Sequence, residues 1–93
     1  SFFELTGEIS KDQILSYPPA PKGFLPEALE MEFTLAADGK VLEIEFIRSS
    51  ADPAEDQRWE NYLRQWLFLP APVLGDSGPL KGKVIFKSRG LGE

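Results

Sequence analysis

Carboxylates are the only abundant side chains in this sequence that could do acid–base chemistry. The 93 residues include 15 aspartates and glutamates but no histidine and no cysteine. Glu30, Glu32, Glu43 and Glu45 alternate with apolar residues in two neighbouring segments, so they would share one face of a β-sheet. Paired carboxylates hydrolyse glycosides, but only where a cleft holds the sugar between them. Because a flat sheet face is far more often a solvated surface, we expect no enzymatic activity.

Metal and cofactor sites are not expected either. Without histidine and cysteine the chain lacks the usual zinc ligands and the usual nucleophile–base pairs. Asp52, Glu55 and Asp56 could ligate Ca²⁺, but they lack the EF-hand pattern and are better explained as the start of a helix. Trp59 and Trp66 could form a ligand box, although at helical spacing they are more typical of a core. The sequence therefore predicts no catalytic residue, metal or cofactor.

The composition restricts the classes of partner. The net charge is −5, with only 10 lysines and arginines, which argues against a nucleic acid or an anionic membrane surface. An apolar content of 42% predicts one folded domain. No apolar run is long enough to span a membrane, and the first ten residues lack the profile of a signal peptide. The proline-rich SYPPAP at residues 16–21 is a weak signal for a polyproline ligand.

Two strands joined by a tight turn are predicted between residues 28 and 48. Residues 28–36, ALEMEFTLA, alternate strictly between apolar and polar, which is typical of a half-buried strand. Asp38-Gly39 then predicts a two-residue hairpin turn, and a second strand follows in which Leu42, Ile44 and Phe46 share one face.

This turn also predicts the pairing of the two strands. Counting back from Asp38-Gly39 sets Phe33 opposite Ile44 and brings the apolar faces together. The same register sets Glu32 opposite Glu45, a like-charge pair that destabilises a sheet unless a cation lies beside it.

An amphipathic helix is predicted from Asp52 to about Leu67. Asp52 is a favourable N-cap, and Pro53 suits the first helical position. One apolar stripe recurs at intervals of three and four residues, and it consists of Trp59, Tyr62, Leu63 and Trp66. Pro70 and Pro72 prevent the helix from continuing.

A third strand is predicted at residues 83–88, KVIFKS. Val84 and Phe86 would face the core, and Lys83 and Lys87 would supply the cations that the glutamates need.

These elements predict an α+β fold. It consists of a three-stranded antiparallel sheet in the order second, first, third strand, packed by one main amphipathic helix. Residues 1–27 are expected to form an extended, proline-rich N-terminal arm, residues 28–88 the α+β domain, and residues 89–93 a C-terminal tail. Within the arm, SFFELTGEIS at residues 1–10 adds either an edge strand or a packed segment. The expected structural core consists of Phe33, Ile44, Phe46, Trp59, Leu63, Trp66 and Phe68.

The order of these motifs resembles the C-terminal domain of the TonB family of periplasmic energy transducers. The resemblance spans about residues 17 to 88 and includes Tyr17-Pro18 and the hairpin DGKV at residues 38–41. It also includes RQWLFLPA at residues 64–71, which is similar to the family signature Arg-x-Trp-x-Phe/Tyr-x-Pro-Ala/Gly. The TolA C-terminal domain is a related alternative that matches this last motif less well.

The resemblance implies how the domain acts. In the TonB family an extended segment of an outer-membrane transporter, the TonB box, adds as a strand to the free edge of the third strand. On this chain it places the partner-binding residues at Lys83, Val84, Ile85, Phe86, Lys87 and Ser88, together with Tyr17 and Pro18.

The resemblance also implies a cellular context. The domain would lie in the periplasm, and the full-length protein would be anchored in the inner membrane and contact motor proteins there through regions outside this chain. A homodimer is one open arrangement. The alternative function is a diverged TonB- or TolA-like interaction or assembly module that does not couple energy.

Overall fold

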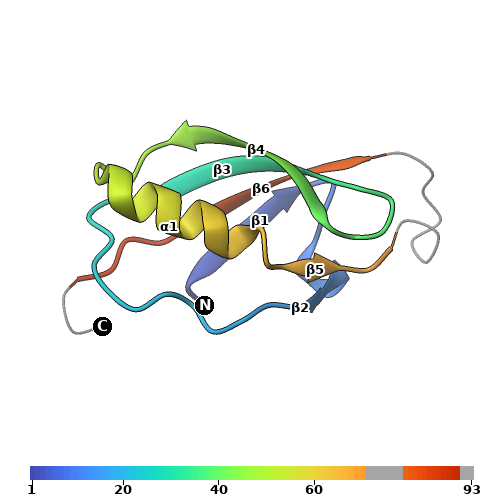
Figure 1. Cartoon of the computed structure of the whole chain (residues 1–93), viewed down its shortest axis with the longest axis horizontal. Coiled ribbons are helices and arrows are strands. Elements are labelled where there is room, and N and C mark those ends of the chain that lie inside the picture. The colour runs from blue at the N-terminus through green and yellow to red at the C-terminus, as the bar shows by residue number, and fades with distance from the viewer. Residues whose placement is uncertain (71–78, 91–93) are drawn as a thin grey trace.

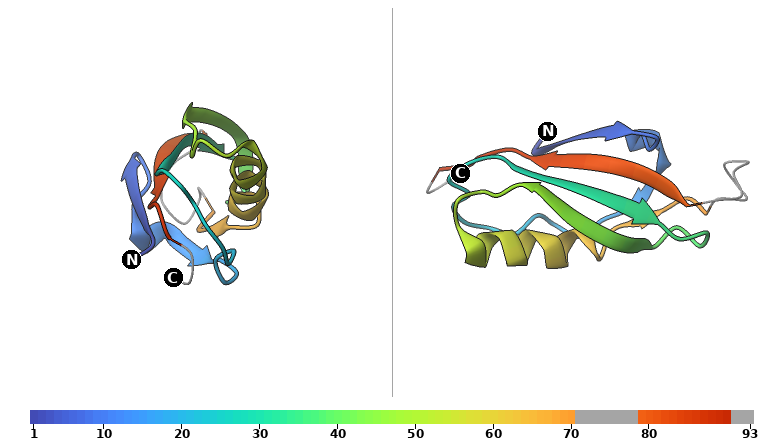
Figure 2. Two further views of the ribbon diagram at one scale, coloured as in Figure 1. Left: turned by 90° about the vertical axis from the view of Figure 1, so that its left-hand side faces the viewer. Right: turned by 90° about the horizontal axis from the view of Figure 1, so that it is seen from above.

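The computed structural model describes residues 1–70 and 79–90. One helix packs on one face of a sheet of long strands (Figure 1; Figure 2, right). The elements in chain order are β1 (Phe3–Gly7), a 3₁₀ turn (Lys11–Gln13), β2 (Ile14–Ser16), β3 (Leu29–Leu35), β4 (Val41–Arg48), α1 (Pro53–Leu63), β5 (Leu67–Phe68) and β6 (Leu80–Phe86). Ala71 and Pro72 of the expected helix exit, and tail residues 91–93, lie outside the described residues.

The main sheet has four antiparallel strands in the order β1-β6-β3-β4, so the prediction of a three-stranded sheet is wrong. β3 pairs with β4 and with β6, and β1 pairs with the other side of β6. The additional strand comes from the N-terminal segment, where Phe3 and Leu5 alternate with Glu4 and Thr6. Because β1 pairs opposite Phe86, Phe3 reaches the same buried face as that side chain.

The first 27 residues therefore do more than run as an extended arm. Besides β1 they contribute β2, which pairs with β5 in a second, two-stranded sheet. Ile9 and Leu25 from this segment are buried in the core. The proline-rich stretch at residues 17–22 lacks helix and strand, as expected where prolines remove backbone donors.

The hairpin turn between β3 and β4 has three residues instead of the two that were predicted. The N–H of Gly39 donates to the carbonyl oxygen of Ala36 at 3.0 Å, and the N–H of Ala36 donates to that of Lys40 at 2.9 Å. Gly39 has φ of 89°, which glycine adopts at little cost. This longer turn shifts the first cross-strand pair by one residue.

A β-bulge then restores the register that the sequence predicts. The pairing shifts between Thr34 and Leu35, where Leu42 is the extra residue on β4. Beyond it Phe33 lies opposite Ile44, and Glu32 lies opposite Glu45. Leu42 is consequently 55% exposed and does not join the apolar face that was predicted for it.

Helix α1 begins as predicted but ends earlier. The Asp52 carboxylate accepts hydrogen bonds from the N–H groups of Ala54 at 3.0 Å and Glu55 at 3.3 Å. The helix ends at Leu63 rather than near Leu67. The next residues turn into β5, where the N–H of Phe68 donates to the carbonyl oxygen of Gly39 at 2.9 Å.

The core fills the space between α1 and the sheet. Phe33, Trp59, Leu63, Trp66 and Phe68 are buried there, and Ile44 packs partly buried against them. Phe46, which was expected in the core, is 43% exposed. The reason is its position on edge strand β4, whose outer side has no neighbouring strand among the described residues.

Candidate protein-binding edges

The edge of β6 that was expected to be free is occupied by β1. Five consecutive residues pair, from Phe3 with Phe86 to Gly7 with Gly82. β6 therefore lies inside the sheet between β1 and β3, as the right panel of Figure 2 shows. A partner strand can reach this side of β6 only by replacing β1.

The direction of the backbone groups on β6 follows from the bonds at the two ends of this pairing. The N–H of Lys87 donates to the carbonyl oxygen of Phe2, and the N–H of Glu8 donates to the carbonyl oxygen of Lys81, both at 3.0 Å. Since bonded and non-bonded pairs alternate in an antiparallel ladder, the N–H groups of Lys83 and Ile85 point toward β1. Those of Val84 and Phe86 point toward β3.

The side chains of β6 divide between the two faces of the sheet. Val84 and Phe86 are buried against the core. Lys83 Nζ lies 3.4 Å from Glu30 on the opposite face, and Lys81 Nζ lies 3.6 Å from Glu32. The prediction of Lys83 as one of these cations is thus confirmed, but the other cation is Lys81 and not Lys87, which lies beyond the end of the strand at Phe86. Ser88 also follows the strand and is exposed.

Tyr17 and Pro18, the other residues that the resemblance assigned to a partner, lie at the end of α1. Tyr17 stacks on Trp66, and its side chain remains 43% exposed. The Tyr62 hydroxyl donates to the carbonyl oxygen of Pro18 at 2.7 Å. These contacts attach the N-terminal segment to the helix exit.

Burial raises the pKa of Tyr62 above its usual value of 10.0, and the negative charge that Tyr17 would carry when ionised adds to this rise.

The second edge of the sheet is β4, which pairs only with β3 among residues 1–70 and 79–90. The same alternation, carried across β3, directs the backbone N–H and C=O groups of Glu43 and Glu45 toward β3. Those of Ile44 and Phe46 therefore point outward. Exposed apolar side chains accompany this edge, because Phe46 is 43% exposed and Ile47 is 49% exposed.

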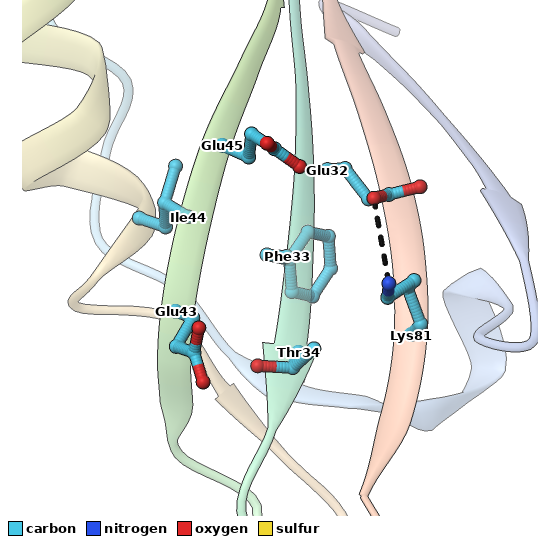
Figure 3. A pocket seen from close by; sticks show the side chains of 7 residues that line it. All are labelled: Glu32, Phe33, Thr34, Glu43, Ile44, Glu45 and Lys81. Carbon is cyan, nitrogen blue, oxygen red and sulfur yellow. Dashed lines mark ion pairs between the residues drawn. The ribbon is translucent and has the colours of Figure 1, made fainter.

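The four glutamates that the sequence placed on one sheet face do gather there. Figure 3 shows Glu32, Glu43 and Glu45 around a shallow hollow of about 240 Å³ that Lys81 borders on the other side. Phe33 and Ile44 line its floor. The hollow is open, and among the described residues no group of three or more acidic side chains is arranged so that it could hold a metal ion.

The acidic residues at the start of α1 make hydrogen bonds and an ion pair within the domain. Burial acts to raise the pKa of Asp56, but hydrogen bonds from the Ser49 and Ser50 hydroxyls and the Ser50 N–H outweigh it. The pKa of this carboxyl is consequently held below 3.8. Glu55 instead pairs with Arg58 on the same helix, at 3.3 Å. Asp52, Glu55 and Asp56 thus act in the helix start.

Comparison of the chain with protein-family models, with curated proteins and with solved structures finds no match. In the part of the chain that the structure describes, no helix has the length and apolar character of a membrane span.

Sequence reasoning left open whether residues 1–10 form an edge strand or a packed arm, and it did not predict that this strand, β1, covers the β6 edge. A signal was present, because Phe3-Glu4-Leu5-Thr6 alternates as a strand should and ends at Gly7. Nothing in that pattern specifies the partner strand, however, since β1 and β6 are separated by most of the chain. The exposed edge of β4 was missed because Phe46 was assigned to the core and Leu42 to the same apolar face of the strand.

Proposed function

We propose that this chain is a protein-binding domain that takes up an extended segment of a partner as an additional strand. The partner is a segment of an outer-membrane transporter, and the domain is the periplasmic end of a TonB-like energy transducer anchored in the inner membrane. A diverged interaction or assembly module of the same fold, without energy coupling, is the alternative.

One observation supports this proposal above the others: β6 already carries an added antiparallel strand on the side that a partner would use. β1 contributes five residues, and by the alternation derived above the N–H groups of Glu4 and Thr6 face the outward groups of β6. Its side chains alternate between apolar residues facing the core and Glu4 and Thr6 facing Ile85 and Lys83. β1 therefore illustrates the kind of segment that this edge accepts.

The geometry also implies competition. A partner segment binds β6 only in molecules from which β1 has separated, so its apparent affinity is reduced by the fraction of molecules in that state. A substitution that weakens the pairing of β1 with β6 should strengthen partner binding. A substitution that removes a backbone group of β6 pointing toward β1 should abolish it. This opposite response distinguishes replacement of β1 from binding at any other surface.

The test is a titration of the isotope-labelled domain with synthetic peptides from the N-terminal segments of outer-membrane transporters, followed by amide chemical shifts. Thr6→Pro removes an N–H that faces β6, and Thr6→Ala keeps it as the matched control. Peptide affinity should rise about tenfold in Thr6→Pro, as expected if one backbone hydrogen bond of β1 is lost.

A second pair of variants acts on β6 itself. Ile85→Pro removes a donor that points toward β1, whereas Ile85→Ala keeps this donor. The proline variant should lose peptide binding while circular dichroism shows a folded domain, and the alanine variant should retain binding. Unchanged amide shifts at residues 83–88 with every peptide, in folded wild type and in Thr6→Pro, would withdraw the proposed function.

A further inference from the structure

Strand β4 presents a second edge with free backbone groups. It is eight residues long, and in the described part of the chain only β3 pairs with it. Ile44 and Phe46 direct their backbone N–H and C=O groups away from the sheet, as derived above. An exposed edge of this length is a template for another strand unless it is blunted. β4 has no proline. Although bulges at Leu42 and Ile47 bend the strand, both bulge residues are apolar and exposed, and Glu43 to Phe46 between them pair regularly with β3.

The charges beside this edge are not balanced. On the solvent-facing side of the sheet, Glu30 and Glu32 of β3 each have a lysine of β6 beside them. Glu43 and Glu45 of β4 continue this acidic face outward, and neither makes an ion pair with any described residue. Glu45 in addition lies opposite Glu32, which places two like charges across one pair.

A polar group next to these acids is also unsatisfied. Thr34 lies opposite Glu43, and its Oγ1 is buried without a hydrogen-bond partner among the described residues. Figure 3 shows Thr34, Glu43 and Glu45 around one hollow that is open to solvent. A cationic side chain that entered this hollow would find two carboxylates that can accept its hydrogen bonds.

We propose that the β4 edge binds an extended segment of a partner protein in which lysine or arginine alternates with apolar residues. The backbone of this segment bonds to the outward groups of Ile44 and Phe46. Its basic side chains then lie beside Glu43 and Glu45, in the way that the lysines of β6 lie beside the acids of β3. Its apolar side chains lie on the other face, beside Phe46.

A second copy of this chain fits the same edge poorly. Antiparallel pairing of two β4 strands about Ile44 would set Glu43 against Glu45 of the partner subunit, and the reverse, so that four carboxylates would line one face. Charge complementarity thus favours a basic segment over a homodimer through β4.

This inference is independent of the proposed function. The two edges lie on opposite sides of β3, so β3 and β6 separate the outer side of β4 from the side of β6 that β1 covers. The segments that they would accept also differ in charge, since β1 presents Glu4 to the lysine-bearing side of β6, whereas β4 presents glutamates.

The test uses a short synthetic peptide in which lysine and valine alternate, and a matched peptide with glutamate in place of lysine. Calorimetry on the wild-type domain should detect the lysine peptide only, with affinity falling as salt is added. The double variant Glu43→Lys with Glu45→Lys should lower the affinity for the lysine peptide about tenfold, a loss that two partly exposed ion pairs can account for. The same variant should bind the glutamate peptide.

Control variants separate this site from general attraction to an acidic protein. Asp12→Lys with Glu27→Lys makes the same change in net charge at two exposed positions outside β4 and should leave both affinities unchanged. Phe46→Pro removes an N–H that points outward from the sheet and should lower the affinity for the lysine peptide. Phe46→Leu keeps this N–H and should bind the peptide as the wild type does.

Equal losses in the two charge-reversed pairs, or full binding by a folded Phe46→Pro variant, would overturn the proposal. The proposal would also be overturned if the wild type dimerised, Phe46→Pro abolished the dimer, and the lysine peptide did not bind. The occupant of the β4 edge would then be a second copy of this chain.

Discussion

The ring of Tyr17 stacks on the ring of Trp66, with centroids 4.9 Å apart and an interplanar angle of 25°. Trp66 is fully buried, while Tyr17 covers it from the solvent side. Phe3 of β1 meets the same indole edge-on, also with centroids 4.9 Å apart. Trp66 therefore joins the helix exit to two segments of the N-terminal region, and several aromatic contacts depend on it.

Replacing Trp66 with alanine should destabilise the domain by about 3–5 kcal/mol, the usual cost of deleting a large buried aromatic side chain. Urea unfolding followed by circular dichroism measures this change. Tyr17→Ala is the matched control, because it removes the exposed partner of the same stack and should cost clearly less. Equal stabilities of Trp66→Ala and wild type would contradict the core role of this residue.

Gly39→Ala should destabilise the hairpin. A Cβ at this position would overlap the carbonyl oxygen of Phe68, and φ is 89°. Gly23→Ala is the control, because Gly23 also has positive φ, but its Cβ would meet only the end of the Arg58 side chain at 3.4 Å. Thermal unfolding should therefore show a larger loss for Gly39→Ala. Equal stability losses in the two variants would mean that the positive φ alone causes the loss and that the contact of Gly39 with Phe68 of β5 contributes nothing.

Asp56 should make stability depend on acid. Its pKa in the folded state is held below 3.8, so the carboxylate contributes stability above that pH. This contribution is lost as the pH falls through the lower folded-state value. Asp56→Asn should therefore be less stable than wild type at neutral pH, and the difference should shrink in acid. Urea unfolding midpoints of both proteins, measured from neutral to acid pH, test this prediction. A stability difference that does not change with pH would argue against a contribution from ionised Asp56.

Tyr62→Phe should lose the hydrogen bond to Pro18 and leave that carbonyl oxygen without its partner, at a cost of about 1–3 kcal/mol. Because burial raises the Tyr62 pKa above 10.0, the wild type should also lose stability as the pH rises through that raised value. Tyr62→Phe should lack this alkaline loss. Thermal melts from neutral to strongly alkaline pH compare the two proteins, and parallel curves would show that another group causes the alkaline loss.

Local patterns in the sequence were sufficient for the elements whose cause is local. Strict alternation located β3, and Asp52-Pro53 located the start of α1, because the period of side chains and the cap chemistry act within a few residues. The pairing of Phe33 with Ile44 was also predicted, although the turn is one residue longer than expected. The bulge at Leu42 compensates for that difference, and a pattern of alternation cannot reveal such a bulge.

Only the tertiary structure decided which strand lies on which edge. β1 occupies the side of β6 that the sequence left open, because Phe3 gains burial there beside Phe86 and Trp66. The same fold leaves Phe46 on an outer strand, although its place in the alternation is that of a core residue. The end of α1 was decided in the same way, since Leu67 and Phe68 bond to β2 and to the hairpin instead of extending the helix. Alternation determines which side chains share a face, but pairing between distant segments depends on the apolar area that the whole chain can bury.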